Sequence, residues 1–174
     1  MTRFENLQQA FTQMNVQKSQ YRVNCLNMAV QVVRTYQLYL GVTADRLRLY
    51  PPSHKIEKGE IPNVPTERAL ELRKDAYYHL GLGLVLTPPR QLLPQNVLTY
   101  RLMFKHLGPM VRVKCGPDCE SYEIPTAGPA QAEVLDKLCT ELYRLADDHL
   151  RESFDDFVQQ RQKNRPIGFR TDEE

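Results

Sequence analysis

The chain has 174 residues, of which 41% are hydrophobic and 25% are charged, and its formal net charge is +2. This composition is typical of a single globular domain, and the net charge by itself does not indicate a nucleic-acid-binding protein. The sequence lacks an apolar run of the roughly 18 residues that span a membrane, and no apolar segment follows the N-terminus as in a secretory signal. Its four cysteines are too few for a disulfide scaffold. We therefore expect a cytoplasmic protein with no membrane partner.

Charge is distributed unevenly along the chain. Residues 129–160 hold three basic and eight acidic side chains, whereas residues 42–128 hold twelve basic and nine acidic ones. This asymmetry predicts an acidic helix near the C-terminus beside a more basic remainder of the domain.

The first forty residues have helical periodicity. Thr2 and Glu5 form a capping-box pattern, and a first apolar run follows it. A second run begins after Ser19 and ends at Gly41, a residue suited to terminate a helix. Because the second run is apolar over most of its circumference, it predicts a central, mostly covered helix at 19–40. The apolar residues of the two runs are Phe4, Leu7, Phe11 and Met14, then Cys25, Leu26, Met28, Ala29, Val30, Val32, Val33, Tyr39 and Leu40.

The next segment supports two interpretations. Residues 51–65 contain four prolines without periodicity, which predicts a long loop. Thr66 can cap a helix that continues to Gly81, followed by a short buried strand. A single long strand from Tyr77 to Leu86 is the alternative.

Residues 97–124 predict a meander of three antiparallel strands. Turn residues divide this stretch at Gly108-Pro109 and again at Gly116-Pro117-Asp118. A last helix is predicted at 130–158. Its apolar stripe changes side after His149. The residues of this stripe are Leu135, Leu138, Leu142, Leu145 and His149, then Leu150, Phe154, Phe157 and Val158.

Together these elements predict an α+β fold. We expect an antiparallel sheet of four to five strands, with the meander at about 97–124, and two long helices at 19–40 and 130–158 packed on one of its faces. Residues 1–160 are assigned to a single domain, and residues 161–174 to a mobile C-terminal tail.

Basic residues alternate with apolar ones in the predicted strands. Because successive side chains of a strand point to opposite faces, this period of two predicts one basic face and one aliphatic face. If Cys115 lies opposite Cys119, then Arg112 pairs with Tyr122 and Lys114 with Glu120. The predicted binding face consists of Arg46, Arg48, Arg101, Lys105, Arg112, Lys114 and Tyr122. The opposite face includes Tyr100, Leu102, Phe104, Val111 and Val113.

Three uses of this basic face stay open. It can be a solvated surface that protects the sheet from aggregation. It can contact an acidic partner, which would be another protein or the acidic last helix of a second copy. It can also bind nucleic acid, because basic side chains interleaved with tyrosines neutralise phosphates and stack on bases.

The segment "CGPDC" contains the weak metal candidates. Cys115 and Cys119 could ligate zinc together with His106, but a second pair of ligands is missing. We expect instead a turn that brings two small thiols together, and a reversible disulfide is a further alternative.

Catalytic signatures are mostly absent, and we expect neither a cofactor nor catalytic residues. No phosphate-binding loop, serine-hydrolase elbow or zinc-protease motif occurs. Cys25 or Cys139 could meet a histidine as a nucleophile pair, but both lie on apolar stripes, where inert thiols are usual. In the last helix, Asp148 and Glu152 beside His149 are interpreted as a salt-bridged face, with Arg144–Asp148 and Arg151–Asp155 pairs.

The sequence thus favours a non-catalytic binding or adaptor protein that self-associates, with nucleic-acid binding by the basic face as the alternative. A twofold dimer is expected because one small sheet face would leave apolar surface of both long helices uncovered. Phe154 and Phe157 are the predicted contacts. The alternative is a monomer in which the helix predicted at 66–80 covers this surface.

Overall fold

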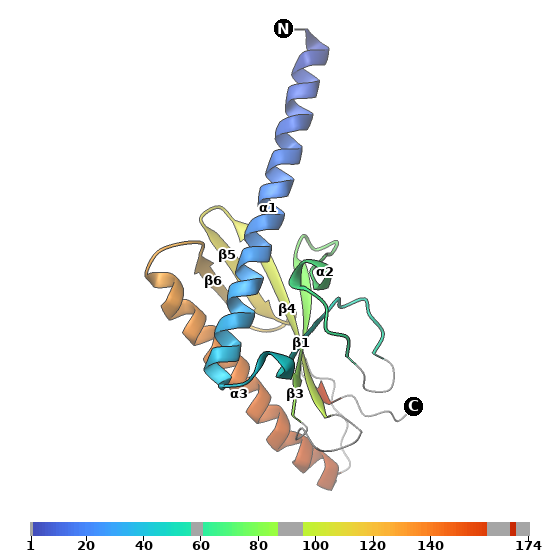
Figure 1. Cartoon of the computed structure of the whole chain (residues 1–174), viewed down its shortest axis with the longest axis vertical. Helices are drawn as coiled ribbons and strands as arrows, with labels where there is room; N and C mark the ends of the chain where they lie inside the picture. The colour runs from blue at the N-terminus through green and yellow to red at the C-terminus, as the bar shows by residue number, and fades with distance from the viewer. Residues whose placement is uncertain (1, 57–60, 87–95, 160–167, 170–174) are drawn as a thin grey trace.

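A computed structural model describes residues 2–56, 61–86, 96–159 and 168–169, and the side chains among them except those of 154–159 and 168–169. The fold is α+β, as predicted: one antiparallel sheet with two long helices against it (Figure 1). The sheet order is β1-β3-β4-β5-β6, with the short strands β2 and β7 pairing with β3 and β4. The strands are β1 Leu47–Tyr50, β2 Glu71–Leu72, β3 Tyr78–Val85, β4 Val97–Leu107, β5 Met110–Cys115, β6 Ser121–Pro125 and β7 Gly168–Phe169.

Helix α1 spans Arg3–Leu40 without interruption, so the two apolar runs of the sequence belong to one helix. The predicted capping box is confirmed, because the Glu5 amide donates to Thr2 Oγ1 at 3.2 Å and the Thr2 amide donates to Glu5 Oε2 at 2.6 Å. Gly41 ends the helix in the left-handed conformation with φ 64°, also as predicted. The N-terminal half projects beyond the sheet, and only the C-terminal half packs on it (Figure 1).

The expectation that residues 19–40 are mostly covered is wrong. One stripe of this half is buried, but Val30 and Leu38 on other sides are 44% and 72% exposed. The sheet and α3 cover only one side of the helix, so its additional apolar residues face solvent. The buried stripe consists of Cys25, Met28, Ala29, Val32 and Tyr36.

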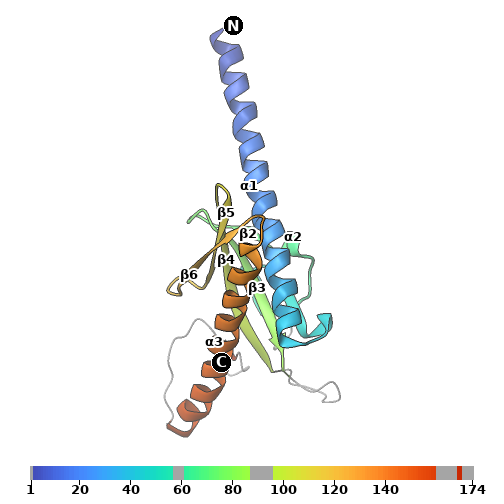
Figure 2. The ribbon, with the colours of Figure 1, turned by 90° about the vertical axis from the view of Figure 1, so that its left-hand side faces the viewer.

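Helix α3 spans Ala130–Gln159 and packs beside α1 on the same face of the sheet (Figure 2). On its outer side, one of the two predicted ion pairs is present. Arg144 contacts Asp148, as expected, whereas Arg151 Nε lies 2.8 Å from Asp147 Oδ2. The Asp155, Phe154 and Phe157 side chains lie outside the described residues, so the predicted contacts at these positions stay predictions.

The prediction of one helix from Thr66 to Gly81 is wrong. A single helical turn, α2 at Thr66–Ala69, is followed by β2, a turn and β3. In the turn, Ala76 adopts φ 62°, which no right-handed helix allows. The alternative of one long strand is confirmed by β3.

The main core lies between the helices and the sheet, and a smaller cluster lies on the opposite face. Tyr36 and Tyr100 join α1 to β4 in the main core, with their hydroxyl oxygens 2.9 Å apart. Burial raises the pKa of Tyr36 to about 12. The smaller cluster consists of Tyr50, Ile61, Val85 and Val97, with Ile56 against it.

The assignment of residues 1–160 to one domain and of residues 161–174 to a tail stays a prediction. Most of the predicted tail, 161–174, lies outside the described residues. Within it, Gly168–Phe169 forms β7 and pairs with Leu98–Thr99, at the end of β4 that does not pair with β5. Among the described residues, no helix is long and apolar enough to cross a membrane.

Candidate functional site

The four basic residues that the prediction placed on β4 and β5 do share one side of the sheet; they are Arg101, Lys105, Arg112 and Lys114. In the register, Lys105 lies opposite Arg112, and Met103 lies opposite Lys114. Arg101 is exposed, whereas the other three side chains are half-buried. The opposite side is buried as predicted, at Tyr100, Leu102, Phe104, Val111 and Val113.

Local partners occupy most of these basic groups. Arg112 Nη2 lies 2.6 Å from Glu123 Oε1, and this hydrogen bond raises the pKa of Arg112. Lys105 Nζ lies 5.2 Å from the centre of the Tyr77 ring. Lys114 Nζ donates to the Pro117 carbonyl at 2.7 Å. The face therefore carries less available positive charge than its sequence indicates.

The two remaining arginines lie toward the β1 edge of the sheet, where the register aligns Arg48 with Gly83 and Thr99, on the same side as Arg101. Arg46 belongs to a short 3-10 helix, η1 at Ala44–Arg46, and donates to the Val85 carbonyl at 3.4 Å. Arg48 donates to the Ile61 carbonyl at 3.1 Å. Both arginines bond to backbone carbonyls of the small second cluster, whose tyrosine, Tyr50, lies over Gly81. The sequence did not reveal this cluster, because Ile61 belongs to an irregular loop.

Tyr122 does not belong to the basic face, so that part of the prediction is wrong. The observed register pairs Tyr122 with Val113, and Arg112 with Glu123. It is shifted by one residue from the expected pairing, which turns the Tyr122 ring toward the main core. The shift places Ile124 opposite Val111, where both are fully buried.

Cys115 and Cys119 are close enough for their thiols to interact, as predicted. Burial raises the pKa of both thiols, that of Cys115 more strongly, so both are protonated at neutral pH. His106 lies elsewhere: its ring nitrogen is 2.8 Å from Asn24 Nδ2, and its ring meets Tyr21 edge-on. Nowhere in the described part of the chain do three or more potential ligands gather around a metal position.

We expect protein purified without a chelator to contain less than about half an equivalent of zinc, because a structural zinc site would be filled. The physical reason is that the structure brings together two of the candidate ligands and leaves His106 at another part of the sheet. Elemental analysis measures this ratio. A value near one equivalent would show that the two thiols recruit other ligands.

The possible thiol nucleophiles are buried in the main core. The Cys25 thiol contacts the backbone of His106 rather than its ring, and burial raises its pKa to about 11. Burial likewise raises the pKa of Cys139 to about 12. A reactive cysteine needs a lowered pKa and access to solvent. These two thiols have neither property.

The projecting half of α1 carries an apolar stripe that the sequence shows, but the exposure of this stripe was not predicted. Its apolar stripe, defined as Phe4, Leu7, Phe11 and Met14, follows the alternating three-and-four spacing of a heptad repeat. The stripe is exposed: Phe4 by 66%, Leu7 by 70% and Phe11 by 61%. The same spacing continues through Tyr21, Cys25, Met28 and Val32, which pack on the body of the domain.

The chain matches no protein-family model, no curated protein and no solved structure at a significant level.

Proposed function

We propose that this protein is a non-catalytic binding protein that self-associates through the projecting half of α1. The observation that carries the proposal is the exposed stripe of Phe4, Leu7, Phe11 and Met14. A surface helix normally turns such a stripe toward a partner. Here the stripe continues a buried one, so the same helix face changes from internal packing to solvent near Lys18.

Helix stability supports the need for a partner. Most helical stability in proteins comes from packing of an apolar face on other elements. In the described structure, the apolar stripe of the projecting half of α1 is exposed rather than packed. The projecting half is rich in glutamine and asparagine and has few charged side chains to form stabilising pairs. Coverage of the stripe by another apolar helix would stabilise both.

A second copy fits this surface because its flanks carry almost no charge. Between Thr2 and Tyr21 the charged residues are Arg3, Glu5 and Lys18. Two copies can therefore approach without strong like-charge repulsion, and the flanks offer little charge to attract a highly charged partner. Glutamine side chains beside the stripe can donate and accept hydrogen bonds across such a contact.

The test is the mass of the protein in solution. At micromolar concentration, light scattering should give about twice the 20.3 kDa of one chain. Leu7→Asp combined with Phe11→Asp should raise the dimer dissociation constant at least about 100-fold, because burying each such side chain contributes about 1.5–3 kcal/mol.

Leu38→Asp is the matched control. Leu38 belongs to the same helix and is 72% exposed, close to the 70% of Leu7, but it lies at the other end of α1. This variant should remain dimeric. A wild-type mass near one chain would refute the proposal, and equal dissociation by both variants would place the interface elsewhere on α1.

Nucleic-acid binding by the basic face is the alternative, and it has weaker support. Its four strand residues do align, but Glu123, Tyr77 and Pro117 engage three of them. The alternative predicts binding of a labelled single-stranded oligonucleotide that weakens steeply with salt. Self-association through an apolar stripe should instead survive added salt.

A further inference from the structure

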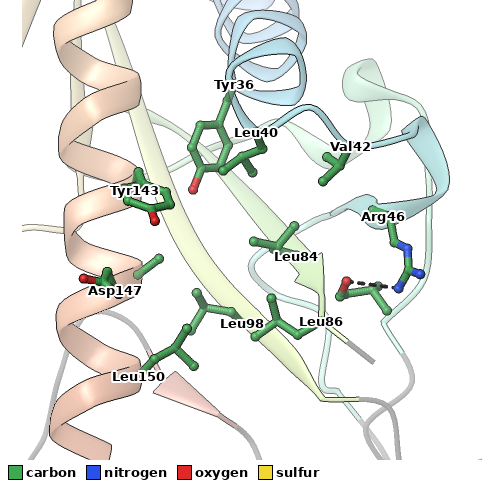
Figure 3. Close-up of a pocket in the computed structure, with 12 residues that line it drawn as sticks. Tyr36, Leu40, Val42, Arg46, Leu84, Leu86, Leu98, Tyr143, Asp147 and Leu150 are labelled. Carbon is green, nitrogen blue, oxygen red and sulfur yellow. Dashed lines mark hydrogen bonds between the residues drawn. The ribbon is translucent and has the colours of Figure 1, made fainter. Parts of the chain in front are cut away.

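The body of the domain lies on the same side of α1 as its exposed apolar stripe. The projecting stripe consists of Phe4, Leu7, Phe11 and Met14. On a helix with about 3.6 residues per turn, its mean direction lies within roughly 30° of that of the buried stripe farther along α1. At the last turns of the helix, Tyr36 and Leu40 line a pocket together with Leu84 of β3 and Leu98 of β4 (Figure 3). A helix that packs on the projecting stripe therefore meets the sheet if it continues past Lys18.

This arrangement excludes a parallel pairing of two projecting stripes. Helices in contact lie about 8–10 Å apart. In a parallel pair, each helix would run on from Lys18 into the space of the partner's sheet, because each sheet covers the side of α1 that faces the partner. Lys18 follows Met14 by four residues and lies in line with the stripe, so the two ammonium groups would also face and repel each other. An antiparallel pair directs the two bodies to opposite ends and avoids both conflicts.

We infer that two copies pair antiparallel along the projecting stripe, with Phe4 beside the partner's Met14 and Leu7 beside the partner's Phe11. This orientation deepens, and depends on, the proposed self-association. Each contact layer then combines one phenylalanine with one smaller side chain, which lets the layers interdigitate. The sulfur of Met14 also gains an aromatic contact. A parallel pair would instead stack like on like, so that layers with two phenylalanines would alternate with smaller ones.

The register follows from the place where the body begins along α1. Tyr21 packs on the body, and its hydroxyl donates to the Ala76 carbonyl at 2.6 Å. Moving the partner by one heptad toward the sheet would place its Phe4 at Tyr21, against the body. Moving it by one heptad the other way would leave half of the stripe unpaired. The inferred register covers the whole stripe and sets Arg3 level with the partner's Asn15, short of Tyr21.

Cross-linking of single cysteines tests the orientation. In this register the two copies of Gln8 lie about 3 Å apart along the helix axis and the two copies of Asn15 about 18 Å apart, at 1.5 Å per residue. Both residues are exposed and flank the stripe on the same side. With bismaleimidoethane, Gln8→Cys should therefore yield at least about fivefold more cross-linked dimer than Asn15→Cys. Each variant also carries Cys119→Ser, because the other three cysteines are buried.

A mixture of two further variants gives an independent result. Arg3 and Gln17 flank the stripe on its other side, and in this register Arg3 lies about 3 Å along the axis from the partner's Gln17. The two copies of Arg3 lie about 18 Å apart, and those of Gln17 about 24 Å apart. Arg3→Cys and Gln17→Cys should therefore cross-link when they are mixed, and at least about fivefold less when each is alone.

Light scattering separates failure of the orientation from failure of the proposed function. A wild-type mass near one chain would refute self-association and the orientation together. A mass near two chains with equal cross-linking of the Gln8 and Asn15 variants would refute the antiparallel orientation alone, because a parallel pair brings both positions equally close. A mass near two chains without cross-linking of any variant would place the contact away from the projecting stripe and would also refute the inference.

Discussion

Phe104→Ala should lower the free energy of unfolding by about 3–5 kcal/mol, the usual loss when a buried phenylalanine is truncated. Phe104 is fully buried on the helix-facing side of β4, between Tyr78 of β3 and Val113 of β5. Three central strands meet at this position, so the surroundings have little freedom to close the resulting cavity. Urea unfolding followed by circular dichroism measures the change.

The neighbouring Lys105 supplies the control for this variant. Lys105→Ala removes a side chain from the same strand but from the opposite face, where it is half-buried. We expect a change within about 0.5–1 kcal/mol, which includes the loss of the Tyr77 contact. Phe104→Leu should give an intermediate loss. A Phe104→Ala loss below about 1 kcal/mol would contradict the packing of the main core at this position.

Gly81→Ala should destabilise the fold by about 2–3 kcal/mol because it overpacks the second cluster. A Cβ atom at Gly81 would lie 2.4 Å from Cε2 of Tyr50, well inside van der Waals contact. Tyr50 is itself buried against Ile61, Val85 and Val97, which restricts its movement away from β3. The same unfolding measurement reports the loss.

Two further variants make this steric explanation specific. Gly83→Ala should cost less, because its Cβ would lie 3.0 Å from Ile61 and 3.1 Å from Val97, whose side chains need only a small shift. Tyr50→Ala should reduce the additional effect of Gly81→Ala to below about 1 kcal/mol, because the two substitutions are coupled through one contact. Additive losses would show that Gly81 is restricted by its backbone rather than by Tyr50.

The long periodic elements were predictable because local pattern and tertiary packing agree in them. In β4 and β5, the alternation of basic and apolar residues matches the observed faces. In α1, the Thr2–Glu5 capping box and Gly41 mark the two ends. Each of these signals depends on neighbours in sequence, so no knowledge of the remaining chain is needed.

The segment 66–80 was not predictable from the same signals, because its local propensity conflicts with its packing. Its alanine, leucine, glutamate and lysine residues favour a helix. In the fold, Tyr78–Val85 is enclosed by β1 and β4 along its edges and by α1 and Tyr50 on its faces, so tertiary contacts select a strand. In the turn, the Ala76 amide donates to the Arg73 carbonyl, and the Arg73 amide donates to the Tyr77 carbonyl.

The register of β6 differs from the predicted one because a single charge pair does not determine how two strands align. Facing Cys115 with Cys119 would have placed Glu123 opposite Val111, on the buried side of the sheet. The observed register instead buries Ile124 there and pairs Glu123 with Arg112. The alternation of Tyr122 and Ile124 contains this information. The exposure of the apolar stripe on the projecting half of α1 has no such signal, because it depends on where the sheet and α3 end in space.

The order of elements along the chain has a consequence for synthesis. Tyr36 of α1 meets Tyr100 of β4, which follows it by 64 residues, and α3 comes later still. At about 5–20 residues per second, α1 leaves the ribosome roughly 3–13 s before its partner strand is available. During that interval its complete apolar face is accessible along the nascent chain. Efficient production should therefore depend on chaperones that cover the apolar face of a nascent helix until its sheet has emerged.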